Sequence, residues 1–161
     1  NSTWNALKAE LVVNADIDVL RKLLVDDSRV GEYDDMFNSC ELICRLNERS
    51  AIRRMTFKAV WPTQPRDFVL CTSWTELENN GIAITTMSVP DEVYPPQNGF
   101  VRGSVNISGY IITPIEPGQN GTGLKVTLCL HTDLGGSLPV GIINMLATSA
   151  PIKMLTTINQ I

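Results

Sequence analysis

The sequence predicts an α+β domain in which one strongly curved antiparallel sheet wraps around a long C-terminal helix. From Cys40 onward, apolar and polar residues alternate in successive runs, which is the period of half-buried strands. Loops rich in Gly, Pro and Asn separate these runs, as expected for an antiparallel meander. The last part of the chain instead carries apolar residues at helical spacing. A sheet and a long apolar helix must cover each other, which predicts a helix-grip arrangement with a space between them.

Two elements are expected before the meander. Residues 7–13 alternate as a strand, and residues 16–26 carry an apolar stripe at helical spacing. Asp16 stands at the start of this helix, where a negative charge favours the helix dipole. A second short helix or turn is expected over 30–37, where Tyr33 contributes an apolar ring.

Six strands and a closing helix should follow. The expected strands are 39–47, 50–60, 67–77, 81–89, 100–114 and 123–133. Turn residues fill the breaks between them, including 78–81, 90–99 and 117–121. The closing helix is expected over 139–160, and Pro151 should kink it or divide it.

The loop 61–66 joins two of these strands into a hairpin. Its two prolines fix the backbone and remove donors, which is typical of a loop between strands. Arg66 and Asp67 are expected to form a local ion pair that holds the loop. Trp61 either packs under the loop or is presented to something apolar outside the molecule.

Alternation defines an inward face for this hairpin if Phe57 points into the core. That face would comprise Arg53, Met55, Phe57, Phe68, Leu70, Thr72 and Trp74. An arginine buried among apolar neighbours needs a carboxylate, a ligand head group or ordered water. In the alternative register Arg53 faces solvent, and Arg54 lies inside instead or neither does. The apolar members of the face are also compatible with ordinary core packing, because a lipid pocket is a core surface with one side open.

Length, composition and charge restrict the function. The 161 residues are 43% hydrophobic and 19% charged, which fits one folded domain over 1–161. A net charge of -4 argues against a nucleic-acid partner. The sequence has neither a signal-peptide pattern nor an apolar run of about 18 residues, so we expect a cytoplasmic protein.

Residues suited to catalysis are scarce. His131 is the single histidine and is expected to be an ordinary polar residue near a strand end, so metal clusters and histidine-dependent triads lack parts. The acidic residues cluster in the helical region and loops and form no obvious facing pair. The cysteines are expected to be free thiols: Cys40, Cys44, Cys71 and Cys129. We therefore predict no catalytic residue, no metal and no cofactor, and expect that the protein is not an enzyme.

Three motifs resemble those of START (steroidogenic acute regulatory protein-related lipid transfer) domains. They are Pro-Arg-Asp-Phe-Val at 65–69, Gly-Phe-Val-Arg-Gly at 99–103 and Thr-Asp-Leu-Gly-Gly-Ser-Leu-Pro at 132–139, in the family's order and spacing. Upstream, the segment 27–34 is similar to the family's Arg-x-x-Trp-Asp step, with Tyr33 in place of tryptophan. The resemblance extends over about residues 8–161.

The resemblance implies a helix-grip fold whose apolar tunnel holds one lipid, with the C-terminal helix as a lid. START domains bind sterols, phospholipids or sphingolipids and move them between membranes without changing them chemically. They usually open with a helix and a strand that would precede Lys8 and are missing here. The chain therefore looks like a truncated or divergent domain.

The resemblance and the alternation together give a set of expected lipid contacts. They are Arg53, Met55, Phe57, Phe68, Leu70, Thr72, Trp74, Thr86, Asn106, Ser108, Tyr110, Leu128, Ile143 and Ala147. Their polar members, among them Arg53, Thr86, Asn106 and Ser108, are expected to fix the head group. Trp61 and Leu138 are expected to touch the membrane, although the second aromatic anchor of the ceramide-transfer protein falls at Ser137.

No lipid class is matched cleanly. In sterol-type START domains the positions of Arg53 and Thr72 often hold a carboxylate and an arginine, and that pair is absent. Val30 stands where the phosphatidylcholine-transfer protein has an arginine for the phosphate. We expect non-catalytic transfer of one lipid, with transient membrane contact and with movement of the helix 139–160 or the Trp61 loop. The alternatives are a lipid-sensing regulatory module with flanking domains and a helix-grip hydrolase.

Overall fold

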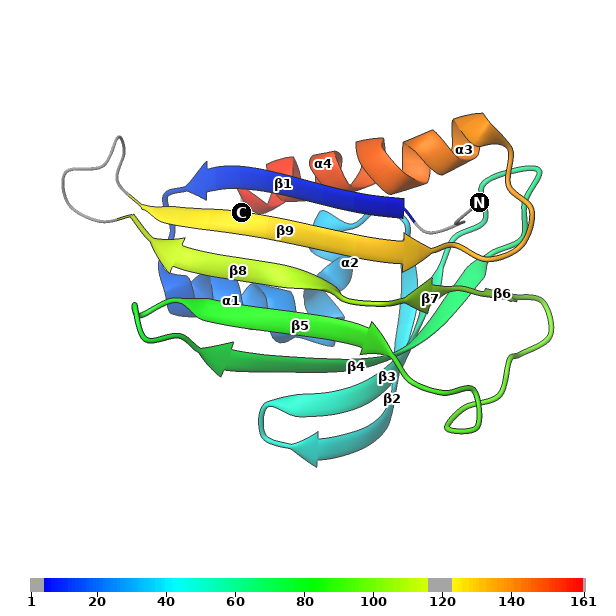
Figure 1. Ribbon diagram of the computed structural model, residues 1–161, viewed down its shortest axis with the longest axis horizontal. Helices are drawn as coiled ribbons and strands as arrows, with labels where there is room; N and C mark the ends of the chain where they lie inside the picture. Colours follow the sequence, from blue (N-terminus) through cyan, green and yellow to red (C-terminus); the bar gives the residue numbers. More distant parts are fainter. Residues whose placement is uncertain (1–4, 116–122, 161) are drawn as a thin grey trace.

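One antiparallel sheet organises the chain. The computed structural model describes residues 5–115 and 123–160 and orders the main strands β1-β9-β8-β5-β4-β3-β2 (Figure 1). Their bounds are β1 (Asn5–Val13), β2 (Phe37–Asn47), β3 (Ser50–Phe57), β4 (Arg66–Glu76), β5 (Ile82–Ser88), β8 (Ser108–Pro114) and β9 (Leu124–Asp133). Two short strands lie off this path: β6 (Val101–Arg102) pairs in parallel with β4, and β7 (Ser104–Val105) pairs with β9. β1 and β2 form the two edges, so the sheet stays open.

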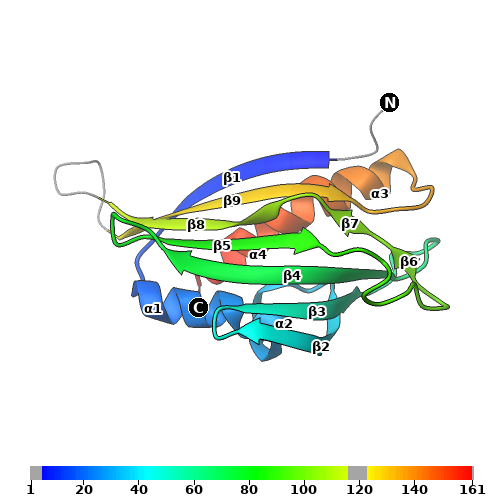
Figure 2. The same cartoon turned by 60° about the horizontal axis from the view of Figure 1, so that its bottom comes forward.

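The helices gather on the concave side of the sheet (Figures 1 and 2). Between β1 and β2 they are α1 (Ile17–Val25), the 3₁₀ helix η1 (Asp27–Arg29) and α2 (Val30–Tyr33). After β9 they are α3 (Val140–Asn144), the π-helical segment η2 (Met145–Ser149) and α4 (Ala150–Ile158). The predicted α+β helix-grip architecture is confirmed.

The helix predicted over 16–26 is confirmed as α1. Asp16 is its N-cap, and its Oδ1 accepts hydrogen bonds from the backbone N–H groups of Asp18 (2.9 Å) and Val19 (3.1 Å). Leu20 and Leu23 are buried because the apolar stripe of the helix turns toward the sheet.

The helix predicted over 139–160 is a continuous helical stretch with a wider turn in its middle. The π-helical segment η2 lies directly before α4, and Pro151 lies in the first turn of α4. A proline has no backbone N–H to donate to the preceding turn. A local π turn accommodates the missing bond without ending the helix.

The core fills the space between the concave face and the helices. Its main cluster includes Ile112 of β8 and Val126 of β9, which are fully buried, and Leu155 of α4 packs into it. A second cluster contains Phe68 and Val105. The apolar side of each central strand thus faces the C-terminal helix, as the alternation predicts.

The strand predicted over 100–114 is interrupted. Gly103 separates β6 from β7, and Asn106 lies in a bend between β7 and β8 rather than within a strand. A Cβ atom on Gly103 would lie 2.3 Å from the ring of Phe68. A larger residue here would force the ring of Phe68 to move, so glycine lets β6 and β7 lie close to the cavity end of β4.

Other boundaries also differ from the prediction. The helix expected over 30–37 ends at Tyr33, because Asp34 takes an extended conformation and its side chain accepts a hydrogen bond from the backbone of Met36 (2.9 Å). Phe37 already begins β2, and β3 ends at Phe57. The turn expected over 117–121 lies outside the described residues. No helix in the described part of the chain is long and apolar enough to cross a membrane.

Candidate functional site

A cavity of about 280 Å³ lies between the concave face of the sheet and the C-terminal helix. Its wall is mostly apolar and is drawn from α2, β3, β4, β5, β7, β8, β9, η2 and α4. The volume is just below the range of about 300–1,000 Å³ for small-molecule pockets. Predicted residues that line it are Met55, Phe57, Phe68, Leu70, Thr86, Ser108, Tyr110 and Leu128.

The register of the β3–β4 hairpin explains this convergence. Met55 pairs with Phe68 and Arg53 pairs with Leu70, and paired residues in an antiparallel ladder point to the same face. Phe68 and Leu70 are buried against the cavity, so the inward face predicted from alternation is confirmed.

Arg53 is on that face but does not line the cavity. Its Nε donates a short hydrogen bond to Oδ2 of Asp27 in η1, which makes a partly buried ion pair between the helical segment and β3. The carboxylate that a buried arginine requires therefore comes from the protein itself. Asp27 is distant in the sequence, so the alternation of the strand could not predict it.

Thr72 and Trp74 lie further along β4, beyond the cavity wall. Thr72 shares a hydrogen bond of 3.2 Å with Thr86 across the β4–β5 pair. The ring of Trp74 is held between the guanidinium groups of Arg21 (4.5 Å to the ring centroid) and Arg49 (4.4 Å). Both contacts fix the position of the side chain within the fold.

The remaining predicted contacts are dispersed. Asn106 is exposed, and its Nδ2 lies 3.1 Å from Nδ1 of His131. Ile143 of α3 does not line the cavity. Ala147 lies in η2, but its side chain is outside the described part of the structure.

The two residues expected to touch a membrane differ in exposure. Trp61 is 88% exposed at the tip of the β3–β4 loop, so it does not pack under that loop. Leu138 is partly buried in the segment between β9 and α3, whereas Val140 at the start of α3 is 73% exposed.

The expected ion pair between Arg66 and Asp67 is wrong. Successive residues of a strand point to opposite faces, so Arg66 faces the cavity and Asp67 faces the outer side of the sheet. Asp67 instead accepts hydrogen bonds from Arg102 (2.9 and 3.0 Å) and Arg54 (2.8 Å). Arg102 also donates to Asp91 (2.6 Å).

These contacts join the three sequence motifs at one end of the cavity. Asp67 of the first motif bonds Arg102 of the second, and Arg66 donates to the backbone oxygen of Leu134 in the third (3.4 Å). Gly135 has a φ of 67°, and a Cβ there would lie 2.5 Å from the backbone oxygen of Arg102. The motif glycines permit backbone approaches that a side chain would block.

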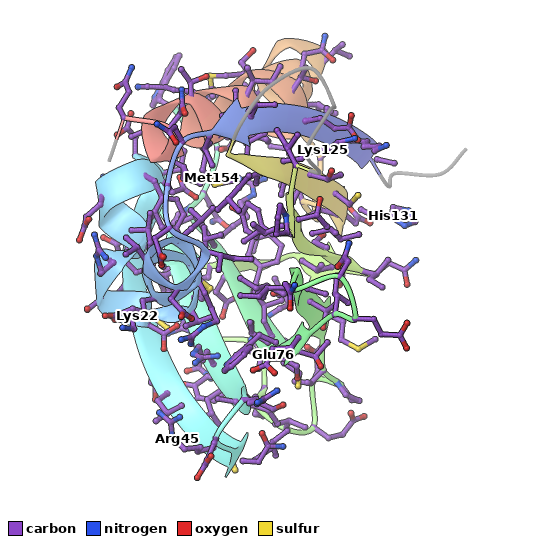
Figure 3. All side chains as sticks on the ribbon, turned by 90° about the vertical axis from the view of Figure 1, so that its left-hand side faces the viewer. Lys22, Arg45, Glu76, Lys125, His131 and Met154 are labelled. Atoms are coloured by element: carbon purple, nitrogen blue, oxygen red, sulfur yellow. The ribbon has the colours of Figure 1, made fainter. Side chains whose placement is uncertain are left out.

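Burial raises the pKa of several polar groups on the wall. Burial is the largest influence on Asp34, whose pKa is raised although its carboxylate accepts backbone hydrogen bonds. Burial also raises the pKa of Tyr33 and of Tyr110, and the Tyr110 hydroxyl donates to the sulfur of Met154 (3.6 Å). Figure 3 places Met154 in the interior, between α4 and the sheet.

The described wall of the cavity contains neither histidine nor cysteine. His131 lies on the outer side of β9 (Figure 3), since its neighbours Leu130 and Thr132 line the cavity. Ser108 does line it, but its hydroxyl accepts a hydrogen bond from the backbone N–H of His131 (3.0 Å). No group of His, Cys, Asp and Glu in the described residues is arranged to hold a metal ion.

Sequence reasoning missed several polar groups on the wall, which are Tyr33, Asp34, Lys58, Arg66 and Thr132. Tyr33 and Asp34 end a helix that is too short for a clear apolar period. Arg66 was assigned to a local ion pair, but the alternation that placed Phe68 and Leu70 inward also places Arg66 inward.

The chain has relatives with two kinds of printed function. It is 30% identical over 115 residues to StAR-related lipid transfer protein 5 of Mus musculus, which is 70% of this chain and 53% of that protein. It is 28% identical over 113 residues to an acetyl-coenzyme A thioesterase of Rattus norvegicus, which is 69% of this chain and 20% of that protein. The chain thus spans about half of the lipid-transfer relative and about a fifth of the thioesterase.

Solved structures show the same fold. Human StAR-related lipid transfer protein 5 superimposes with a TM-score of 0.84 at 20% identity, covering 96% of this chain and 74% of that one. At this identity the similarity describes the fold. The family model for the START domain matches residues 1–160. The three motifs converge at one end of the apolar cavity under the C-terminal helix. The chain therefore belongs to the START domain family.

Proposed function

We propose that this chain binds a single lipid in its cavity and transfers it between membranes without changing it chemically. The observation that carries the proposal is the cavity itself, a largely apolar space enclosed by a curved sheet and a helix. Burial of acyl or ring surface there stabilises a complex by about 25 cal/mol per Å² of apolar area. The lipid-transfer relatives support the same reading.

On the described wall of the cavity no hydroxyl group is seen hydrogen-bonded to a basic side chain, which supports the non-catalytic part of the proposal. An acyl transfer needs an activated nucleophile within hydrogen-bond reach of a base. On the described wall, the hydroxyl of Ser108 has a backbone N–H as its hydrogen-bond partner, and the ionisable side chains are Tyr33, Asp34, Lys58, Arg66 and Tyr110.

A regulatory role within a longer protein is the second candidate. The thioesterase relatives are about five times longer than the segment that they share with this chain, so START-like segments occur inside larger enzymes. Such a segment can control a neighbouring domain if the whole protein has two conformations. The lipid then favours the conformation that binds it more tightly.

Native mass spectrometry of the purified chain tests lipid binding directly. We expect one co-purified or added lipid per chain, identified after organic extraction. Leu130→Trp fills the cavity from β9 and should abolish binding, whereas Ile111→Trp places the same ring on the outer side of β8, where Ile111 is 47% exposed, and should leave it unchanged.

Transfer and hydrolysis are then separated by two assays. Labelled lipid should move between donor and acceptor vesicles faster with the wild-type chain and Ile111→Trp than with Leu130→Trp. Acyl-coenzyme A substrates should stay intact in the same incubations. If the wild-type chain hydrolyses acyl-coenzyme A and Leu130→Trp does not, the non-catalytic proposal is wrong. If no sample contains bound lipid, the proposal of lipid binding is wrong.

A further inference from the structure

The cavity wall contains a positive charge that forms no salt bridge with any described acidic residue. Arg66 is the first residue of β4, is 6% exposed and lines the cavity at the end closed by the β3–β4 loop. Its cross-strand partner is Phe57, and Phe68 follows on the same face. The guanidinium therefore lies in an apolar wall. An arginine side chain stays protonated even in such surroundings.

Every hydrogen-bond acceptor around this guanidinium is neutral. Nη1 donates to the hydroxyl of Thr63 (2.8 Å) and to the backbone oxygen of Gln64, and Nε donates to the backbone oxygen of Leu134 (3.4 Å). Within the described residues Arg66 forms no salt bridge and its Nη2 forms no hydrogen bond, but this atom is not fully buried, because the buried side-chain atom without a partner there is Nη2 of Arg54. The adjacent carboxylate of Asp67 lies on the opposite face of the strand and binds Arg54 and Arg102.

Arg66 thus differs from Arg54 and Arg102, because it has no carboxylate partner among the described residues. On the outer side of the sheet, Arg54 and Arg102 share the buried Asp67, although Nη2 of Arg54 has no hydrogen-bond partner. On the inner side, burial lowers the pKa of Arg66, and no salt bridge is formed within the described part of the chain. A largely buried charge without a counter-charge is unfavourable unless water or a ligand completes its hydrogen bonds.

We propose that Nη2 of Arg66 binds an anionic oxygen of the lipid, either a carboxylate or a phosphate, while the apolar chain of the lipid fills the rest of the cavity. The proposal rests on the proposed function, since it specifies the chemistry of the ligand in the same cavity. Guanidinium N–H groups match the geometry of carboxylate and phosphate oxygens, and charge-assisted hydrogen bonds are strongest where water is excluded. The preferred ligand is an anionic amphiphile rather than a neutral sterol or alcohol.

Other ionisable groups on the wall are less suited to this role. Lys58 is exposed, and its Nζ donates to the backbone oxygen of Asp35 (2.7 Å), so water screens its charge. Burial raises the pKa of Asp34, but a carboxyl group carries no positive charge that could attract an anion in either protonation state. Tyr33 and Tyr110, with pKa values raised by burial, stay protonated.

The test compares lipids with the same oleyl chain and different head groups. Oleate, 1-oleoyl-lysophosphatidate and oleyl alcohol are presented below their aggregation concentrations, and binding is measured by equilibrium dialysis of labelled lipid. We expect at least one of the two anions to bind about tenfold more tightly than the alcohol or better, which corresponds to one charge-assisted hydrogen bond. The tighter anion identifies the carboxylate or the phosphate as the source.

Variants assign the effect to Arg66. Arg66→Met should lose about tenfold or more in affinity for the preferred anion and change the affinity for oleyl alcohol little. Arg66→Lys retains the charge without the planar donors and should give an intermediate loss. Arg45→Met removes one positive charge from exposed β2, at the far end of the molecule in Figure 3, and should leave all affinities unchanged.

A measurement on the wild-type protein covers the case in which Arg66 variants do not fold. Oleate labelled with ¹³C at its carboxyl should give a bound signal that is still ionised at pH 5, because an adjacent arginine favours the charged form. A bound carboxyl that titrates above pH 6 would overturn the proposal. So would equal binding of the anions and the alcohol, which leaves lipid binding intact. If none of the three lipids binds and neither cholesterol nor phosphatidylcholine does, the proposed function fails and this inference fails with it.

Discussion

Asp67 shows how one residue can hold a motif together. Its carboxylate is completely buried and serves two arginines, Arg54 and Arg102. Asp67→Asn would leave both positive charges without a counter-charge. We expect the free energy of unfolding to fall by about 3–5 kcal/mol, the cost typical of removing one partner from a buried ion pair. Urea denaturation at pH 7 measures the change.

Asp91→Asn is the matched control for that substitution. Asp91 bonds the same Arg102, but its side chain is 57% exposed, so its loss should cost no more than about 1 kcal/mol. Equal costs for the two variants would mean that burial of Asp67 has no special effect.

The same carboxylate predicts a pH dependence. Burial by itself would raise the pKa of Asp67, but the hydrogen bonds and charges of Arg102 and Arg54 outweigh burial and lower that pKa below its ordinary value. The stabilisation is therefore fully present above the unfolded pKa of about 3.9 and disappears as pH falls through the lower folded pKa. Denaturation curves between neutral pH and pH 3 should show this loss in the wild type. A similar loss in Asp67→Asn would assign it to other groups.

Cys40 is expected to be the least reactive of three thiols on the β2 and β9 strands. Burial raises its pKa to about 12, with a further contribution from the negative charge of Asp27. Because the thiolate is the nucleophile, alkylation at pH 8 should modify the exposed Cys44 and Cys129 well before Cys40. Mass spectrometry of peptides after timed labelling measures the order, and early labelling of Cys40 would contradict its burial.

Trp61 is the residue on which membrane contact depends in our proposal. It is 88% exposed, so Trp61→Ser should not lower stability, but it should weaken binding to neutral vesicles by roughly tenfold, since burying such a ring is worth about 1.5–3 kcal/mol. Leu46→Ser removes an exposed apolar residue of β2, next to the turn into β3 and away from the Trp61 loop, and serves as the control. Vesicle co-sedimentation distinguishes them, and equal losses would mean that the loop has no specific role.

At the scale of elements, the C-terminal helix combines a packed half and an exposed half. Leu155 and Ile158 of α4 are buried in the core, whereas Val140 of α3 is exposed and no residue of α3 is buried. The π turn of η2 separates the two halves. Because few contacts hold α3, it is the part of this helix best able to move when a lipid enters.

Gly141→Ala tests whether the backbone freedom of this glycine lowers the stability of α3. Nothing lies within 4 Å of the position that a Cβ would take, and alanine favours a helix over glycine by about 1 kcal/mol. We expect a gain of about 0.5–1 kcal/mol in the free energy of unfolding and slower uptake of lipid. Faster uptake would argue against opening through α3.

The elements that the sequence predicts well are those with a long, unbroken period. α1, the β3–β4 hairpin and the long C-terminal helix follow from alternation or helical spacing, and the inward face from Met55 to Leu70 follows from the same period. The segment 100–114 was less predictable, because its breaks depend on the ring of Phe68 and on pairing with β4 and β9.

The cavity wall could be predicted only where strands contribute to it. Around the cavity, Arg53 and Asp67 pair with Asp27 and Arg102 from distant segments, and no local pattern specifies such pairs. Placing Arg66 inside required the strand rule to be applied two residues before Phe68, the first apolar residue of β4.

At the scale of the whole molecule, hydrogen exchange should divide the chain into a stable sheet and a mobile entrance. Amides of β4, β5 and β8 lie in the interior of the sheet and should exchange slowly, whereas those of α3 and the loop 58–65 should exchange faster. Bound lipid should protect α4 and the cavity strands. Entrance amides that are as protected as the central strands, with and without vesicles, would contradict entry at this end.

The pairing of β1 with β9 also has a consequence for folding during synthesis on the ribosome. β1 is synthesised well before its partner β9, with Asn5 opposite Thr132 and Val13 opposite Leu124. During translation β1 must wait as an unpaired strand while the residues between the two strands are made. Contacts over such sequence separations form slowly, and a waiting strand edge invites wrong partners. Two strands that are neighbours in the sheet are thus made far apart in time. The cavity cannot form until β9 has left the ribosome.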